Sequence, residues 1–109
     1  MDNALIARRP GKQTQDFFEA LDKLLDIAES DTGQGLHVAN FLLAWWNAQT
    51  CGGFDLTDLW AVDLDIARRM FVIMQGIVNY RMYPDSLGYS TRFEALIHYR
   101  RPHLLEQQD

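Results

Sequence analysis

Apolar residues recur at helical spacing along most of the chain. Between residues 15 and 30 they fall three or four positions apart, which places them on one face of a helix. Thr14 is the predicted N-cap, because a threonine hydroxyl can accept a hydrogen bond from an unpaired amide. The glycines between Asp31 and Gly35 are expected to end the helix in a left-handed conformation. The predicted core stripe consists of Phe17, Phe18, Leu21, Leu24, Leu25 and Ala28.

A second helix is predicted over residues 36–48, and it is apolar nearly all round, which is typical of the centre of a bundle. Its polar exceptions, His37, Asn40 and Asn47, share one narrow stripe. Trp45 and Trp46 are adjacent, so their side chains point about 100° apart on the helix. We therefore expect them to face different neighbours, one of them at an interface such as that of a homodimer.

The pattern then predicts a short helical turn over residues 54–60 and a long third helix from its N-cap, Asp63, to about Met82. Gly76 inside this helix implies a close backbone approach or a bend. The turn is expected to pack Phe54, Leu56, Leu59 and Trp60 beneath the second helix. The buried side of the third helix is predicted to comprise Ile66, Ala67, Met70, Phe71, Ile73, Met74, Ile77 and Val78.

A turn at Pro84 to Gly88 leads to a fourth helix, with Thr91 and Glu94 spaced as a capping box and an end before Pro102. No segment alternates with the period of two that marks a strand. The fold class predicted is all-α: a single-domain, compact bundle of about four main helices plus a short helical turn. Residues 1–13 are predicted to form a flexible N-terminal tail, and residues 14–109 the helical domain.

Length and composition narrow the class of protein. The 109 residues suffice for one domain, and the single cysteine, Cys51, permits no internal disulfide, which fits a reducing cytoplasm. The longest apolar run, Phe41 to Trp46, has six residues, whereas a membrane span needs about 20. No apolar stretch of a signal peptide is present at the N-terminus. We expect a cytoplasmic protein without a membrane segment.

The sequence offers no catalytic residue, metal-ligand set or cofactor motif. Asp31-Thr32-Gly33 resembles the triplet of aspartic proteases, but it follows a helix and has no second copy, so we interpret it as a turn. Cys51 is expected to be an inert thiol. Other candidates lack the spacing of metal ligands or of a calcium loop: His37, His98, His103, Asp55, Asp58, Asp63 and Asp65.

Charge is distributed unevenly over the chain, whose net charge is −5. Residues 13–65 hold ten acids against one base, a net charge of −9, and residues 66–109 hold six arginines against four acids. On the first helix, four acids lie on one face about 5 Å apart, a linear charge density similar in order to that of a DNA strand. A solvated helix face is the ordinary interpretation. The functional one is a partner-binding surface formed by Glu19, Asp22, Asp26 and Glu29.

Three strings carry a resemblance to a known family: Val38 to Ala48, Gly52 to Trp60 and Tyr83 to Tyr89. Over about residues 21–102 the sequence resembles an uncharacterised family of short proteobacterial proteins, carried mainly on integrative and conjugative elements and other mobile DNA. No catalytic residue can be transferred, because no activity is assigned to that family. The resemblance implies a mobile element in a bacterial host.

These observations favour a small, non-enzymatic protein–protein interaction module, most concretely an inhibitor of a host defence complex of the anti-CRISPR type. The acidic face would occupy a basic nucleic-acid-binding groove of a host protein, with Tyr83, Tyr89 or Tyr99 as anchors and no direct nucleic-acid contact. The alternative is an accessory protein of conjugation or element maintenance, whose arginines touch nucleic acid: Arg92, Arg100 and Arg101. A third class, a small hydrolase or metalloenzyme, would need bound metal or a reactive thiol.

Overall fold

The computed structural model describes residues 11–106, and within this range it contains helices and loops but no strand. This confirms the prediction of an all-α fold with four long helices and a short helical turn. The α-helices are α2 (Lys12–Ala28), α3 (Gly33–Cys51), α4 (Leu64–Tyr80), α5 (Ser90–Arg100) and the short α6 (His103–Glu106). Two 3₁₀-helices, η1 (Leu56–Ala61) and η2 (Pro84–Leu87), lie in the connections.

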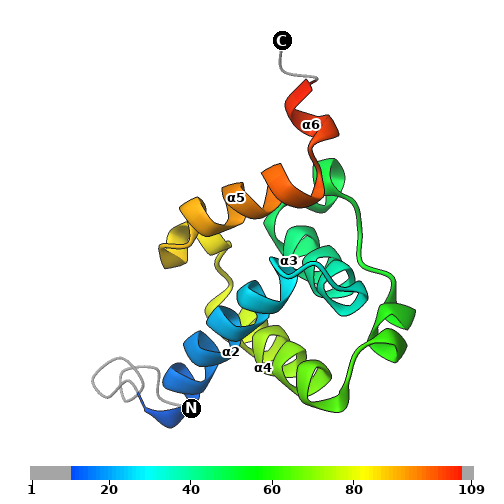
Figure 1. Ribbon diagram of the computed structural model, residues 1–109. Coiled ribbons are helices and arrows are strands. Elements are labelled where there is room, and N and C mark those ends of the chain that lie inside the picture. Colours follow the sequence, from blue (N-terminus) through cyan, green and yellow to red (C-terminus); the bar gives the residue numbers. More distant parts are fainter. Residues whose placement is uncertain (1–10, 107–109) are drawn as a thin grey trace.

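The long helices pack in a row, with α2 and α3 as the inner pair. α2 packs against both α3 and α4, and α3 packs against α2, η1 and α5. In Figure 1, α5 accordingly lies above α3, and α4 lies below α3, beside α2. The apolar helix predicted at the centre is thus an inner helix, but it shares that position with α2.

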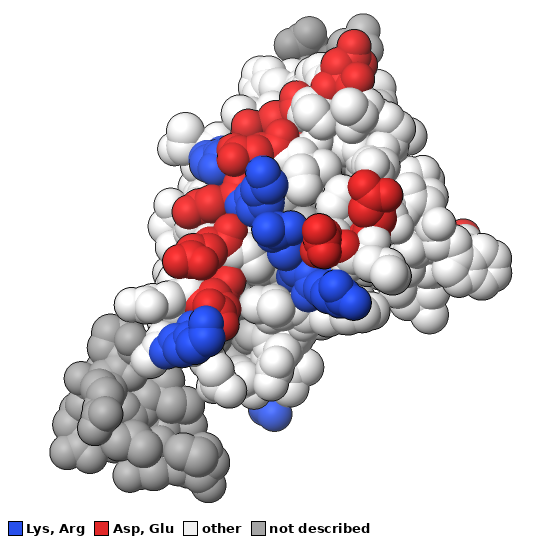
Figure 2. All heavy atoms as spheres, turned by 60° about the horizontal axis from the view of Figure 1, so that its bottom comes forward, with Lys and Arg blue, Asp and Glu red and all other residues white. Residues whose placement is uncertain are grey.

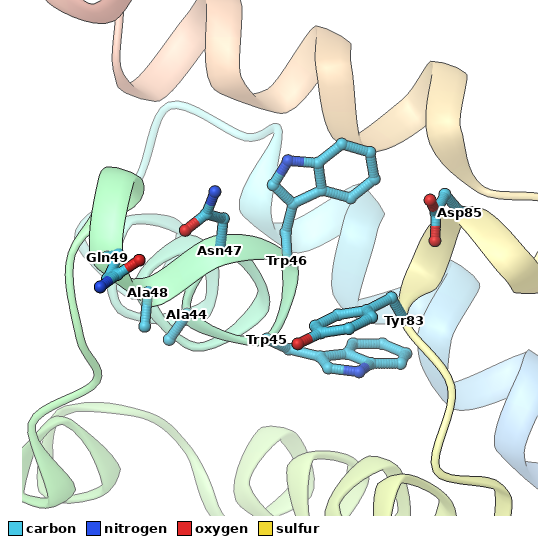
Figure 3. Close-up of a pocket in the computed structure, with 8 residues that line it drawn as sticks. All are labelled: Ala44, Trp45, Trp46, Asn47, Ala48, Gln49, Tyr83 and Asp85. Atoms are coloured by element: carbon cyan, nitrogen blue, oxygen red, sulfur yellow. The ribbon is translucent and has the colours of Figure 1, made fainter.

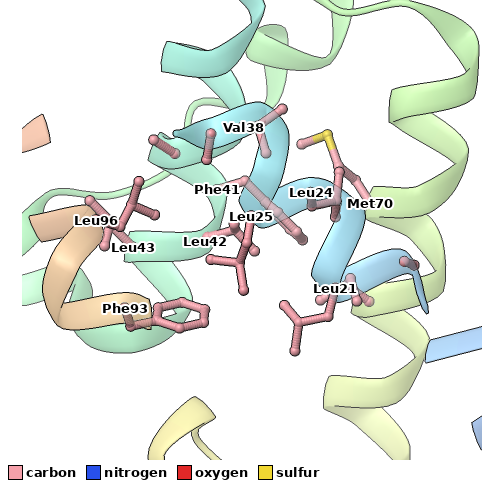
Figure 4. Close-up of a cluster of buried hydrophobic side chains, with 14 of the residues drawn as sticks. Leu21, Leu24, Leu25, Val38, Phe41, Leu42, Leu43, Met70, Phe93 and Leu96 are labelled. Atoms are coloured by element: carbon pink, nitrogen blue, oxygen red, sulfur yellow. The ribbon is translucent and has the colours of Figure 1, made fainter. Parts of the chain in front are cut away.

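The core is formed where these four helices meet (Figure 4). α2 and α4 contribute the side chains that their apolar period places on one face, whereas α3 is apolar nearly all round. Most of the predicted stripe of α2 is buried, and Phe18 is half-buried. The fully buried large side chains include Phe17, Leu21, Leu24 and Leu25 of α2, Val38, Leu42 and Leu43 of α3, Met70 and Ile73 of α4, and Phe93 and Leu96 of α5.

The predicted N-cap of α2 is wrong. The helix begins at Lys12 after the extended residue Gly11, so Thr14 lies inside it. The Thr14 hydroxyl instead shares a hydrogen bond of 3.3 Å with the Tyr80 hydroxyl of α4. Of the predicted tail, residues 12 and 13 are therefore helical, and residues 1–10 lie outside the described range.

The break between α2 and α3 does not use a left-handed glycine. Thr32 is the N-cap of α3, and its side chain accepts a hydrogen bond of 3.0 Å from the Gly35 amide. Gly35 is buried, and a Cβ there would stand 2.6 Å from the Ile27 carbonyl oxygen and 2.8 Å from that of Ser30. The glycine is required because two helix ends approach closely, rather than because of its φ angle.

Gly76 of α4 also permits a close approach, but of a side chain. The ring of Phe17 lies directly against it, in the space that a Cβ would occupy. The two explanations expected from the sequence, a neighbouring backbone or a bend, are both replaced by this aromatic contact. It sets the spacing between α2 and α4.

Several apolar side chains predicted to be buried are exposed. In the η1 segment Phe54 and Leu59 pack against the core, whereas Leu56 and Trp60 are 71% and 84% exposed. On α4, Phe71 and Val78 point to solvent. These two residues lie on the outer side of α4, whose inner side packs against α2. The apolar stripe of α4 is therefore wider than the surface that α2 covers.

The helix boundaries predicted from the sequence agree in part with those of the structure. Asp63 is the N-cap of α4 as predicted, although its side chain makes no capping bond and its amide donates to the Gln34 side chain (2.7 Å). The predicted capping box of α5 is wrong, because this helix begins at Ser90 and Thr91 lies within its first turn. α5 ends at Arg100, before Pro102, as expected. Over the described range no helix combines the length and the apolar character needed to cross a membrane.

Candidate functional site

The four acids singled out in the sequence lie on the outer side of α2, opposite its buried stripe, and all four are exposed. We refer to them as the acidic ridge: Glu19, Asp22, Asp26 and Glu29. Helical spacing of three and four residues places them in one row. The structure therefore brings all the predicted partner-binding residues together on one accessible helix face.

One residue that the sequence did not associate with the ridge, Arg92 of α5, contacts three of its members. An Arg92 terminal nitrogen donates to Asp26 Oδ1 at 3.1 Å and to Glu29 Oε1 at 3.0 Å. The other terminal nitrogen lies 4.0 Å from Asp22 Oδ1. Burial lowers the pKa of Arg92, but the bonds to Glu29 and Asp26 outweigh it, and the net shift is upward. The ridge thus joins α2 to α5.

Tyr89 is the second contact of the ridge from outside α2. Its hydroxyl donates to Asp22 Oδ1 at 2.8 Å, and its ring stacks on Phe18 with centroids 6.1 Å apart. Burial, the hydrogen bond to Asp22 and the charge of Asp22 raise the pKa of Tyr89 to about 12. Of the proposed aromatic anchors, Tyr83 and Tyr99 are exposed, whereas Tyr89 is half-buried and already holds the ridge.

The ridge keeps an excess of negative charge after these contacts. Three carboxylates share one guanidinium, and Glu19 makes no ion pair with any basic residue in residues 11–105. Asp22 and Asp26 remain 58% and 67% exposed. Figure 2 shows one face of the molecule, on which a band of acidic side chains runs beside basic ones. The surface is acidic along a row rather than over a broad area.

A second polar group lies between α3, η1 and the end of α5, and we call it the Asp58 cluster: His37, Asn40, Asp58 and Arg101. His37 Nδ1 lies 2.9 Å from Asp58 Oδ1, and Asn40 Nδ2 donates to Asp58 Oδ2 at 3.4 Å. Arg101 donates to Asn40 Oδ1 at 2.7 Å and to the Cys51 carbonyl at 2.9 Å. The cluster joins α3, η1 and the end of α5.

Local structure explains how these side chains meet. His37 and Asn40 are three residues apart, so they lie on one face of α3. Asp58 is placed by the start of η1, where Asp55 caps the helix by accepting from the Thr57 amide at 2.9 Å. The polar stripe predicted on an otherwise apolar helix was a signal that polar partners cover it. Those partners, Asp58 and Arg101, could not be identified from spacing along the chain.

The Asp58 cluster contains a histidine oriented by a carboxylate, which is one part of an acid–base catalytic arrangement. Among the described residues, no hydroxyl or thiol is hydrogen-bonded to His37. The Cys51 side chain is buried, and burial raises the pKa of its thiol, an effect that Arg101 offsets in part. In the same part of the chain, no three His, Cys, Asp or Glu side chains gather as a metal site would require.

The three C-terminal arginines expected to touch nucleic acid in the accessory-protein alternative all donate to groups of the protein itself. Arg92 contacts the ridge and Arg101 the Asp58 cluster. Arg100 donates to the Ala28 carbonyl at 3.1 Å and to the Ser30 carbonyl at 2.7 Å, at the end of α2. A phosphate would have to compete with these bonds for each guanidinium.

Trp45 and Trp46 share a neighbour, contrary to the expectation from their positions on the helix. Trp45 meets the Phe93 ring edge to face at 5.9 Å, and Trp46 stacks on the same ring at 5.5 Å. The prediction was wrong because one large ring on α5 fills the angle between the two indoles. Both tryptophans are half-buried, and the homodimer interface expected at one of them stays a prediction.

The fold and these contacts define a small all-α domain with a charged helix face held by an arginine from another helix. The chain belongs to a family of unknown function, DUF7673, which it matches over residues 18–101. No curated protein and no solved structure matches the chain. The predicted resemblance to an uncharacterised family is confirmed to that extent, and the proteobacterial and mobile-element origin stays a prediction.

Proposed function

We propose that the protein is a non-enzymatic interaction module that binds a basic surface of another protein through the acidic ridge. The observation that carries this proposal is the excess of carboxylates over guanidinium on the ridge, together with their exposure. Acidic side chains in excess of their intramolecular partners retain charge for an external cation. A basic groove lined by Lys and Arg is the complementary surface.

The contacts of Arg92 and Tyr89 support the proposal in a second way. They fix the carboxylates of Asp22, Asp26 and Glu29 before any partner arrives. A side chain that is already ordered loses less conformational entropy on binding. The ridge therefore presents its charges in a preset row. Their spacing is of the same order as the spacing of charges along a nucleic-acid strand.

The most concrete form of this function is an inhibitor of a host defence complex, of the anti-CRISPR type, that occupies a nucleic-acid-binding groove. The mobile-element origin expected from the sequence favours this form, and that origin is itself a prediction. The alternative, an accessory protein of conjugation or element maintenance, has less support, since its nucleic-acid contacts would need Arg92, Arg100 and Arg101, which donate within the protein. An accessory protein that binds its protein partner through the ridge, without touching nucleic acid, is still compatible with the structure.

The test is affinity capture with the tagged full chain from a proteobacterial lysate with active defence systems, washed in rising salt and analysed by mass spectrometry. The expected product is a nucleic-acid-binding complex that is lost as salt rises, because salt screens the exposed charges. Recovery of a partner that resists salt and lacks a basic groove would contradict the proposal. A gel shift with duplex DNA checks the expected absence of direct DNA affinity.

Variants separate binding from folding. Glu19→Lys reverses a ridge charge that Arg92 does not use, so capture should fall while the helical circular dichroism spectrum is unchanged. Asp22→Asn with Asp26→Asn removes two charges and keeps acceptor oxygens for Arg92. Asp65→Lys on α4 is the matched control for the Glu19 reversal, and it should capture as the parent does. Equal capture by Glu19→Lys and the parent would remove the ridge from the proposal.

A further inference from the structure

A cavity of about 530 Å³, open to solvent, lies where the end of α3 meets the segment that leads into η2 (Figure 3). Its volume is within the range of small-molecule sites. The helix is interrupted at this point, because the backbone of Asn47 is not helical (φ −167°, ψ 91°). The lining residues are Ala44, Trp45, Trp46, Asn47, Ala48, Gln49, Tyr83 and Asp85.

Three aromatic rings line the cavity, and two of them are held in place from behind. The indole nitrogen of Trp45 donates to the Met82 carbonyl at 3.1 Å, so the donor of this side chain is already used. Trp46 stacks on Phe93 and is directed toward α5, whereas Trp45 and Tyr83 lie below Trp46 in the view of Figure 3. Tyr83 is 66% exposed.

The charge of the cavity has one sign. Among residues 11–106, Asp85 is the only charged residue in the lining, and no Lys or Arg of this range takes part in it. One Asp85 oxygen accepts from the Ser86 amide at 2.8 Å, and the side chain is exposed. The faces of aromatic rings are electrostatically negative, so the rings add to the effect of the carboxylate. Both features favour a cation and disfavour an anion.

We propose that this cavity binds an organic cation with a compact, alkylated ammonium head group. Methyl groups on the nitrogen bury apolar surface against Trp45, Trp46 and Tyr83 while the positive charge is attracted to the rings and to Asp85. An unsubstituted ammonium is more strongly hydrated and would lose more on entering an aromatic site. The head group can come from a free small molecule of the choline class or from a methylated lysine side chain of a protein. The site is independent of the acidic ridge, since no residue of α2 lines it.

The test follows the indole N–H signals of the full ¹⁵N-labelled chain by NMR during a choline titration at constant ionic strength. The chain has three tryptophans, and Trp60 is a built-in control because it is exposed on η1 and absent from the lining. We expect saturable shifts for Trp45 and Trp46 and none for Trp60. 3,3-Dimethylbutan-1-ol, the neutral analogue with the same shape, should bind at least about fivefold more weakly.

Two variants test the named residues. Asp85→Asn keeps the side-chain shape and should raise the choline Kd about fivefold. Tyr83→Ala should abolish saturable binding, whereas Tyr83→Phe should retain it. Asp65→Asn and Tyr99→Ala change an exposed acid and an exposed tyrosine outside the lining, and they should bind choline as the parent does.

The outcomes decide the proposal and the source of the cation. Equal binding of choline and its neutral analogue, or no shift of Trp45 and Trp46 with choline, would overturn it, as would an unchanged Kd for Asp85→Asn. A trimethyllysine peptide provides the second arm. Tighter binding of the peptide than of choline assigns the site to a protein side chain, and the opposite order assigns it to a small molecule.

Discussion

The acidic ridge and the Asp58 cluster are built from the same kinds of side chain but have opposite balances. On the ridge, three carboxylates share the guanidinium of Arg92, and the acids are exposed. In the cluster, the single carboxylate of Asp58 contacts both His37 and Asn40. Arg101 donates a hydrogen bond to Asn40, and the whole group is partly buried. The Asp58 side chain is 15% exposed, against 67% for Asp26.

This difference separates a surface suited to binding from one suited to holding the fold. Partly buried polar groups that satisfy one another contribute to stability and leave little for an outside partner. Exposed charges in excess contribute little to stability but keep their attraction for a partner. Changes in the cluster should therefore alter unfolding, and changes in the ridge should alter binding and salt dependence.

The largest effect on stability is expected for Arg101→Met. The substitution removes the bonds to Asn40 and to the Cys51 carbonyl and leaves these acceptors without their donor. A loss of about 2 kcal/mol in the free energy of unfolding is expected, because hydrogen bonds from charged groups are among the stronger ones. Urea denaturation measures it. A loss no greater than that of Arg68→Met, an exposed arginine of α4, would show that Arg101 does not hold the fold.

A smaller loss, about 1 kcal/mol, is expected for Asp58→Asn, which keeps the shape but loses the charge facing His37. Because the cluster is partly buried, the loss should change little between low salt and high salt. Chemical denaturation at two ionic strengths measures both quantities. A strong salt dependence would mean that Asp58 behaves as a surface charge.

Arg92→Met is expected to cost less than about 1 kcal/mol, as exposed ion pairs do. The three carboxylates then repel one another without their shared cation, so the loss should shrink as salt is added. Thermal unfolding followed by circular dichroism over a salt series is the measurement. Loss of stability at all salt concentrations, equal to that of Arg101→Met, would abolish the distinction between the two groups.

The smallest effect at neutral pH is expected for Tyr89→Phe, and its signature is in alkali. The folded pKa of Tyr89 is about 12, above the ordinary value of 10. Both states hold the proton below pH 10, so the stabilisation by Tyr89 is complete there. Between pH 10 and 12 the unfolded chain releases its proton first, and stability falls. The melting temperature of the parent should drop more steeply than that of Tyr89→Phe across this interval, and parallel curves would contradict the assignment.

The helices were predictable because their signal is local. Apolar residues three or four positions apart place a stripe on α2 or α4 whatever the rest of the chain does. The ends were less predictable, since Thr14 and Thr91 have the residue type of a cap but lie inside helices whose start is set elsewhere. The prediction of burial failed where burial depends on the packing of other helices, as for Trp60 and Phe71, which are exposed.

The residues of the two sites also differ in how far the sequence could predict them. The row of acids on α2 follows from helical spacing alone, so its four residues were found. Arg92 and Tyr89 lie more than sixty residues further along the chain, and no periodicity links them to the ridge. The stripe containing His37 and Asn40 was visible, but its partner Arg101 is 61 residues from Asn40. Contacts of this kind need the tertiary arrangement.

The adjacent pair Arg100 and Arg101 has a consequence for how the protein is made. Arg100 donates to the Ala28 carbonyl at the end of α2, 72 residues earlier in the chain. Arg101 donates to the Cys51 carbonyl at the end of α3, 50 residues earlier. A growing polypeptide can form α2 and α3 as each emerges, but it cannot close these contacts until residue 101 has left the ribosome. During translation α2 and α3 can therefore form and meet before the contacts that tie their ends to the end of α5 are made.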